Sequence, residues 1–165
     1  MQRIALLSDT HNYLAPEIIK YFDGCDQIWH AGDIGTIAIT DKLAEIKPVV
    51  AVYGNIDGQD VRNVHPKNQH FKCEEVSVFM THIGGYPNRY SMDALAEIKL
   101  HRPKLFICGH SHILKVMFDS NYQLLHINPG AAGIHGFHKV KTMVRFTIDG
   151  DKIKDLEVIE LGERV

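Results

Sequence analysis

Short apolar runs alternate with helical patterns over the first third of the chain. After Pro16, apolar residues recur at helical spacing as Ile18, Ile19 and Phe22, and Gly24 is a stop signal. In order, the pattern predicts a strand, a helix, a strand, a helix and a strand, at residues 4–7, 16 onward, 27–30, 36–47 and 49–53. Elements that alternate in this way favour parallel strands joined by right-handed crossovers.

The pattern changes after residue 70. Residues 71–74 and 76–80 predict a hairpin, and residues 91–101 predict a helix whose inward face holds Leu95, Ile98 and Met92. A buried strand is expected at 105–108, and alternating strands are expected at 114–118, 122–127, 142–148 and 153–159. No linker or repeat divides the chain. We therefore predict one domain over 1–165 with an α/β fold, a four-layer αββα sandwich of two mixed sheets flanked by helices.

Composition narrows the classes of function. The 165 residues carry a net charge of -2 and no block of Lys and Arg, so the sequence lacks the footprint of a general nucleic-acid binder. No segment has the roughly 20 apolar residues that span a membrane, and the apolar run at residues 4–7 is too short for a signal peptide. Cys25, Cys73 and Cys108 have no paired spacing, which favours buried thiols. We expect the protein in the cytoplasm.

Five polar motifs each follow a predicted strand: Ser8-Asp9-Thr10-His11, Gly32-Asp33, Gly54-Asn55, Thr81-His82 and Gly109-His110-Ser111-His112. Ligands bind at the carboxyl ends of strands in open α/β sheets, so these motifs are expected to converge. Oxygen and imidazole ligands without thiolates suit Mn²⁺, Fe or Zn²⁺. Taken singly, each motif is more readily explained as a turn residue or as a histidine with an ordinary hydrogen-bond partner. The ordered set indicates two metal ions that share one carboxylate, which is a usual arrangement for cleaving phosphate esters with water.

With their neighbours, these motifs resemble the calcineurin-like metallophosphoesterases, and the small single-domain prokaryotic phosphodiesterase branch in particular. The resemblance rests also on His30-Ala31, Ile56-Asp57 and Asn128-Pro129-Gly130, which extend the motifs. It implies that one ion is held by Asp9, His11, Asp33 and His112. It implies that the other is held by Asp33, Asn55, His82 and His110. A hydroxide between the ions would then attack the phosphorus atom of a phosphodiester.

Individual residues are expected to have roles in catalysis or substrate binding. Asn55 and His82 are expected to be catalytic as ligands of the second ion. Ile56 stands where larger phosphatases carry a histidine that protonates the leaving group, so Asp57 is a candidate general acid, or equally a turn carboxylate. Arg89 is a candidate for binding the substrate phosphate, or a solvated loop residue.

The sequence departs from the usual family pattern at two further positions, and it contains histidines outside the motifs. Asn12 replaces a frequent glycine but tolerates left-handed backbone, and Ala131 replaces a serine. His30 is expected to support Asp33 or its turn. Of the histidines without a motif, His135 and His138 are the best candidates to reach the site.

The motifs, the resemblance and the charge together give the expected cofactors and partners. We expect two divalent ions, with Mn²⁺ favoured and Ni²⁺, Fe or Zn²⁺ as alternatives. A small phosphodiester is preferred because the motifs carry little positive charge for a dianionic monoester. No general binding to nucleic acid or to membranes is expected, and the acidic pI disfavours a nuclease. Assembly into a homo-oligomer is possible on the sequence. The rival hypothesis is a scaffold for a protein partner, as in the retromer cargo-recognition subunit, although that protein lacks the histidine equivalent to His82.

Overall fold

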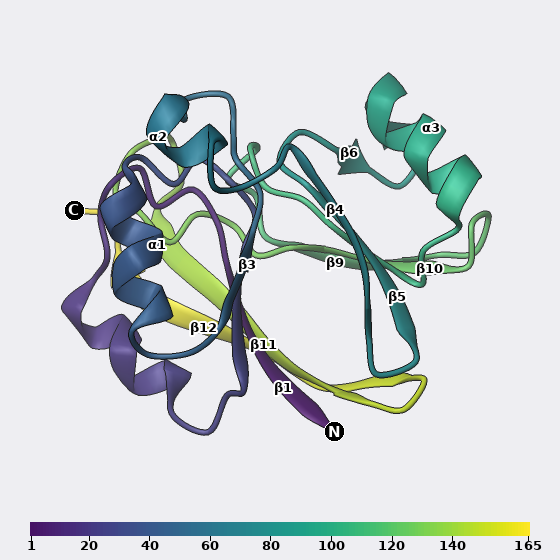
Figure 1. The fold of residues 1–165 in the computed structure, drawn as a ribbon, viewed down its shortest axis with the longest axis horizontal. Coiled ribbons are helices and arrows are strands. Elements are labelled where there is room, and N and C mark those ends of the chain that lie inside the picture. Colours follow the sequence, from purple (N-terminus) through teal and green to yellow (C-terminus); the bar gives the residue numbers. More distant parts are fainter.

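Two five-stranded mixed sheets pack face to face in the computed structural model, which describes residues 1–165 (Figure 1). The first sheet has the strand order β12-β11-β1-β2-β3. Strands β1, β2 and β3 are parallel, as the sequence predicts, and β11 pairs antiparallel with both β1 and β12. The bounds of this sheet are β1 Gln2–Leu7, β2 Gln27–His30, β3 Val49–Ala51, β11 Val140–Asp149 and β12 Lys152–Glu163.

The second sheet has the order β4-β5-β8-β10-β9. The predicted hairpin forms as antiparallel β4 and β5, while β8 runs parallel to β5 and β10. Its bounds are β4 Asn68–Cys73, β5 Val76–Thr81, β8 Leu105–Ile107, β9 Lys115–Asp119 and β10 Leu124–Asn128. A short separate hairpin, β6 Gly85–Tyr86 and β7 Arg89–Tyr90, leads from β5 toward helix α3.

Helices cover the outer faces of both sheets. In Figure 1, α1 and α2 lie on the side of the first sheet and α3 lies on the side of the second. The helices are the 3-10 helix η1 Pro16–Phe22 and the α-helices α1 Ile37–Ala44, α2 Gln59–Arg62 and α3 Met92–His101. The predicted four-layer α/β sandwich is confirmed. Every helix falls short of the length and apolar content that crossing a bilayer would require.

Three apolar cores hold the layers together. Ile4 and Leu6 of β1 face the core between the sheets, while Ala5 and Leu7 of the same strand face the core beneath the helices. Burial on both faces explains why the first strand is a continuous apolar run. A third core joins α3 to the outer face of the second sheet and includes Phe106. The three cysteines are buried and free, as expected.

Local geometry departs from the sequence pattern in two helices. Residues 16–22 form a 3-10 helix, in which Ile18 and Phe22 are buried but Ile19 is 53% exposed. Ile18 and Phe22 pack into the core beneath the helices, whereas Ile19 lies outside that core. In α3, Ala94 and Ile98 face the core, whereas Met92 is 89% exposed, so its predicted inward position is wrong. Met92 begins the helix directly after the Ser91 cap and lies beyond the edge of the sheet core.

His126 is an unusual buried group in β10. Its side chain has no exposure and stacks on the ring of Phe106 with centroids 5.2 Å apart. Nδ1 lies 3.3 Å from the Phe106 carbonyl oxygen, and Nε2 has no hydrogen-bond partner. Burial lowers the pKa of His126 to about 4. The folded state therefore holds this ring neutral in a pH range where the unfolded chain protonates it.

Replacing His126 by leucine should make the metal-free protein less sensitive to acid. Because the pKa is lowered on folding, the stabilisation is present above pH ~6.5 and is lost as the pH falls from ~6.5 toward 4. Between pH 7 and pH 5, wild type should lose about 2 kcal/mol more unfolding free energy than His126→Leu, measured by urea denaturation. An equal loss in both proteins would contradict this origin of acid sensitivity.

Candidate metal centre

Hydrogen bonds tie the loops that carry the predicted ligands into one unit. In the first sheet, the Asp9 amide donates to the Gly32 carbonyl at 2.9 Å. In the second, the Gly109 amide donates to the His82 carbonyl at 3.0 Å. The His110 amide joins the two sheets by donating to Asp9 Oδ2 at 3.1 Å. The carboxyl edges of both sheets therefore meet at a single place.

The structure brings the seven predicted ligand side chains together there, in two groups. Asp9, His11 and His112 form one group, and Asp33, His82 and His110 form the other. In the first group, His112 Nε2 lies 3.1 Å from Asp9 Oδ1. Asn55 joins the second group through its Oδ1 atom, which accepts a hydrogen bond from His110 Nδ1 at 3.0 Å.

Asp33 lies between the two groups. Its Oδ2 atom is 3.2 Å from His11 Nε2, and its Oδ1 atom is 3.2 Å from His82 Nε2. Each carboxylate oxygen therefore faces a different set of imidazoles. This is the arrangement that a carboxylate shared by two cations requires.

Unsatisfied buried atoms test whether the site suits metal ions. Asp9 Oδ1, His11 Nε2 and His82 Nε2 are buried without a hydrogen-bond partner. Such atoms are rare in folded proteins and costly unless something else satisfies them. His82 Nδ1 donates to the Ala31 carbonyl at 2.7 Å, which leaves Nε2 with its lone pair available in the neutral ring. Divalent cations would satisfy all three atoms, so the residues present fit the metals.

The charge state of the site depends on the same contacts. Burial alone would raise the pKa of Asp33, yet its contacts with His11 and His82 hold the pKa well below the usual range. The Asp33 and Asp9 carboxylates raise the pKa of His11 to about 9. Burial lowers the pKa of His82, but Asp33 and Asp9 outweigh burial and raise it. Protons on histidines therefore balance two buried carboxylates, and cations would supply the same positive charge.

Backbone strain is concentrated at the site. Five of the predicted ligands have left-handed φ values between 44° and 71°: Asp9, His11, Asp33, His110 and His112. Non-glycine residues adopt this region only at a cost of order 1–3 kcal/mol each, and such residues cluster at functional sites. Asn12 has φ 67°, which confirms that asparagine accommodates the turn where glycine is frequent.

Side chains behind the ligands fix these strained loops. The Gly32 amide donates to His30 Nδ1 at 3.1 Å, and His30 Nε2 in turn donates to Thr10 Oγ1 at 3.0 Å. His30 is fully buried, and burial lowers its pKa to about 3, so the ring is neutral. It therefore supports the turns rather than the Asp33 carboxylate. Asn128 does the same for the last motif, because its Nδ2 donates to the Gly109 carbonyl at 3.0 Å.

Asp57 is buried and spans two loops. Its Oδ2 accepts from the amides of Gly54 at 2.7 Å and Ile34 at 3.1 Å, and its Oδ1 accepts from Gly35 at 2.8 Å. The three backbone donors come from the loop after Asp33 and from the loop that carries Asn55, so Asp57 joins these two loops. These contacts favour a role in holding the loops together, and proton transfer by Asp57 stays a prediction.

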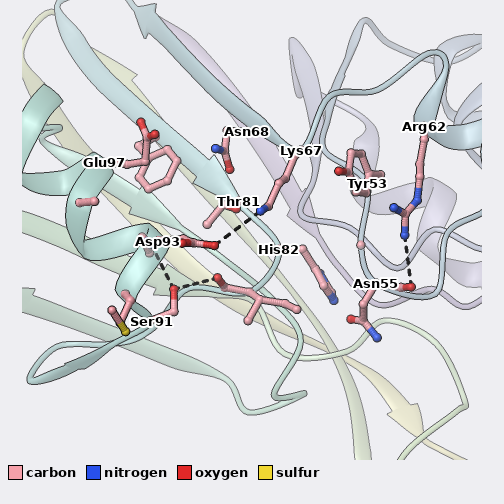
Figure 2. A pocket seen from close by; sticks show the side chains of 16 residues that line it. Tyr53, Asn55, Arg62, Lys67, Asn68, Thr81, His82, Ser91, Asp93 and Glu97 are labelled. Atoms are coloured by element: carbon pink, nitrogen blue, oxygen red, sulfur yellow. Dashed lines mark hydrogen bonds and ion pairs between the residues drawn. The ribbon is translucent and has the colours of Figure 1, made fainter.

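A cleft of about 680 Å³ opens from the Asn55 and His82 side of the site. Figure 2 shows Asn55 at one end and Glu97 of α3 at the other. Arg62 and Lys67 line it, and neither belongs to a sequence motif. Arg62 donates to the Asn55 carbonyl at 3.4 Å and lies over the Tyr53 ring. Arg89, the predicted substrate ligand, is exposed on β7 and does not line this cleft, so its role stays a prediction.

Two further histidines reach the site from the loop before β11. The His135 ring stacks on His11 with centroids 4.9 Å apart, and His138 meets the edge of His112 at 5.1 Å. His138 Nε2 donates to the Gly133 carbonyl at 2.7 Å. Both were candidates on the sequence, but only the tertiary structure gives them specific neighbours.

Gly54→Ala should abolish binding of a second ion. A Cβ atom at Gly54 would collide with Asp33 Oδ1 and with the Asp33 backbone, which cannot yield as cheaply as a flexible side chain and is already in the left-handed region at φ 54°. Gly58→Ala is the matched control, because its Cβ would meet nothing nearer than Asp60 Oδ1 at 3.4 Å. Metal content after dialysis against Mn²⁺ should fall in Gly54→Ala only. Unchanged metal content in a folded Gly54→Ala variant would contradict the assigned position of Asp33.

Comparisons with known proteins agree with this architecture. The family model of the calcineurin-like phosphoesterase superfamily domain matches residues 2–151 of this chain. A protein from Methanothermobacter thermautotrophicus, named a probable metallophosphoesterase, is 28% identical to this chain, over 98% of this chain and 94% of that protein.

Solved structures share the fold at lower identity. The structure of an archaeal phosphodiesterase has a TM-score of 0.75 and 20% identity, covering 95% of this chain and 99% of that one. Vps29 from Chaetomium thermophilum has a TM-score of 0.76 and 16% identity, covering 99% and 100% of the two chains. At these identities, the two structures establish the fold alone.

Proposed function

We propose that this chain, which belongs to the calcineurin-like phosphoesterase superfamily, is a phosphodiesterase that requires two divalent metal ions. The observation that carries the proposal is the position of Asp33, whose two oxygens each lie 3.2 Å from an imidazole of a different ligand group. When bound, a pair of divalent ions supplies Lewis-acid stabilisation of phosphoryl oxygens and lowers the pKa of a bound water. Mn²⁺ is the proposed metal, in keeping with the mixed oxygen and nitrogen ligands.

The chain's own residues would hold and orient the reacting groups. Asp9, His11, Asp33 and His112 would bind one ion, and Asp33, Asn55, His82 and His110 would bind the other. His82 is oriented by its hydrogen bond to the Ala31 carbonyl, and the Asp33 carboxylate by the Ile56 amide at 3.1 Å. Such preorganisation matters because the groups need not rearrange as charge develops on the phosphate.

Charge along the cleft supports a diester as substrate. Two cations, Arg62 and Lys67, and two acids, Asp93 and Glu97, line it, so the formal lining charge is zero. Lys67 Nζ moreover lies 3.6 Å from Asp93 Oδ2, so the Asp93 carboxylate offsets part of the Lys67 charge. A monoanionic diester suits such a cleft better than a dianionic monoester. The apolar part of the lining, which includes Tyr53 and Met92, would accommodate an organic ester group.

A second candidate function is a scaffold that binds a protein partner. The chain shares its fold with Vps29 at a TM-score of 0.76, and this shared fold leaves the scaffold open as a candidate. Unpartnered buried ligand atoms favour the enzyme, because a scaffold gains nothing from them. Metal content and turnover separate the two functions.

Asn55→Ala should retain the fold and lose activity. We expect wild type to hydrolyse an aryl phosphodiester only with Mn²⁺. Removing the Asn55 amide should lower turnover by roughly 100-fold or more, the scale of losing one preorganised polar group. Asn63→Ala, at the exposed end of α2, is the control and should be active. Two bound ions without turnover in wild type would favour the scaffold, and no bound ions would refute the proposal.

Asp57→Asn tests whether this carboxylate donates a proton. From its three backbone contacts, we expect equal losses of turnover for diesters with good and poor leaving groups, together with weaker Mn²⁺ binding. If Asp57 is instead the general acid, the loss will be large for a poor alkyl leaving group and small for 4-nitrophenol, with Mn²⁺ binding unchanged. Rates for a series of leaving groups distinguish the two roles.

A further inference from the structure

Three side chains of types that can bind metals lie together beside the far end of the cleft, away from the candidate metal centre. His70 lies on β4, and Glu97 and His101 lie one turn apart on α3. Residues four apart on a helix project from the same face. None of the three belongs to the sequence motifs or to either ligand group described above.

The ligand atoms of these residues converge on a single point. Glu97 Oε2 lies 2.8 Å from His70 Nε2 and 3.2 Å from His101 Nε2. Ligands around tetrahedral Zn²⁺ are roughly 3.3 Å apart, given bond lengths of about 2.0–2.1 Å. All three ligand atoms lie within 4.8 Å of one another, and the two distances from Glu97 Oε2 are close to the spacing that a bound ion would impose.

The ring of His70 is held in place by its surroundings. It stacks on Phe79 with centroids 4.6 Å apart and planes 6° from parallel, and its centroid is 4.0 Å from that of His101. Phe79 belongs to the apolar core beneath α3 and does not move freely. A fixed ring loses little conformational freedom on binding a metal.

We propose that His70, Glu97 and His101 form a third, mononuclear metal site that binds Zn²⁺. Two imidazoles and one carboxylate are a donor set that Zn²⁺ accepts, with the fourth position left for water or a ligand. The site shares no residue with the dinuclear centre and does not depend on the proposed hydrolysis.

Local electrostatics support this assignment. The site lies on the last turns of α3, where the helix dipole favours positive charge. The Glu97 carboxylate supplies the one formal negative charge.

Binding would clamp α3 onto the second sheet. Glu97 also lines the cleft that contains Asn55 and His82, so the ion would lie at the cleft's opposite end (Figure 2). A clamp there would fix the wall of the cleft formed by α3. We therefore expect Zn²⁺ at this site to stabilise the fold even when the dinuclear centre is disabled.

The test is Zn²⁺ stoichiometry after equilibrium dialysis at micromolar free Zn²⁺, measured by elemental analysis. Wild type should bind one equivalent more than His101→Gln and Glu97→Gln. Asp93→Asn removes a neighbouring α3 carboxylate outside the triad and should bind as much as wild type. Equal stoichiometry in wild type and both triad variants would overturn the proposal.

A second measurement separates this site from the dinuclear centre. In an Asp33→Asn background, Zn²⁺ should still raise the Tm, and adding His101→Gln should remove that rise. Metal-free Tm values of the two proteins check that His101→Gln is folded. If Zn²⁺ raises the Tm of both equally, the triad is not the site. Loss of the dinuclear ions alone would refute the proposed function and leave this inference standing.

Discussion

The burial of two carboxylates, Asp9 and Asp33, at the meeting edge of two sheets is the constraint on which the site depends. Asp9 is fully buried and Asp33 is 3% exposed, so neither can rely on water for its charge. Compensation must come from positive charge brought to the same place. Histidines from both sheets surround the pair, and the Nε2 atoms of His11 and His82 have no hydrogen-bond partner. The negative charge of the two carboxylates is therefore balanced only when protons or cations are bound at the site. For this reason we interpret it as a candidate metal centre.

The loops that carry Asp9 and Asp33 are strained, and contacts from other side chains hold them in place. Left-handed backbone at Asp9 and Asp33 is costly, and it persists because other side chains hold the loops. His30 bonds to Gly32 and Thr10, and Asp57 accepts three amides from two loops. The parallel strands behind them are buried on both faces and provide a rigid base. Fold stability and site geometry thus rest on the same contacts.

The sequence predicted the layers and the convergence of the motifs because both follow from local pattern. Apolar runs give the buried strands, and polar residues at strand ends must meet at one edge. What it could not predict depends on contacts between distant segments. Arg62 has no motif, and the nearness of His70 to His101 depends on how α3 packs against β4. Ile19 and Met92 fit a helical pattern but lie outward, since the pattern does not record where the core beneath each helix ends.

The most direct test of the account is anomalous diffraction from crystals of the protein loaded with Mn²⁺. The account predicts two anomalous peaks on opposite sides of the Asp33 carboxylate, one beside Asp9, His11 and His112 and one beside Asn55, His82 and His110. A single peak, or none, at this edge of the sheets in fully loaded protein would contradict the dinuclear centre.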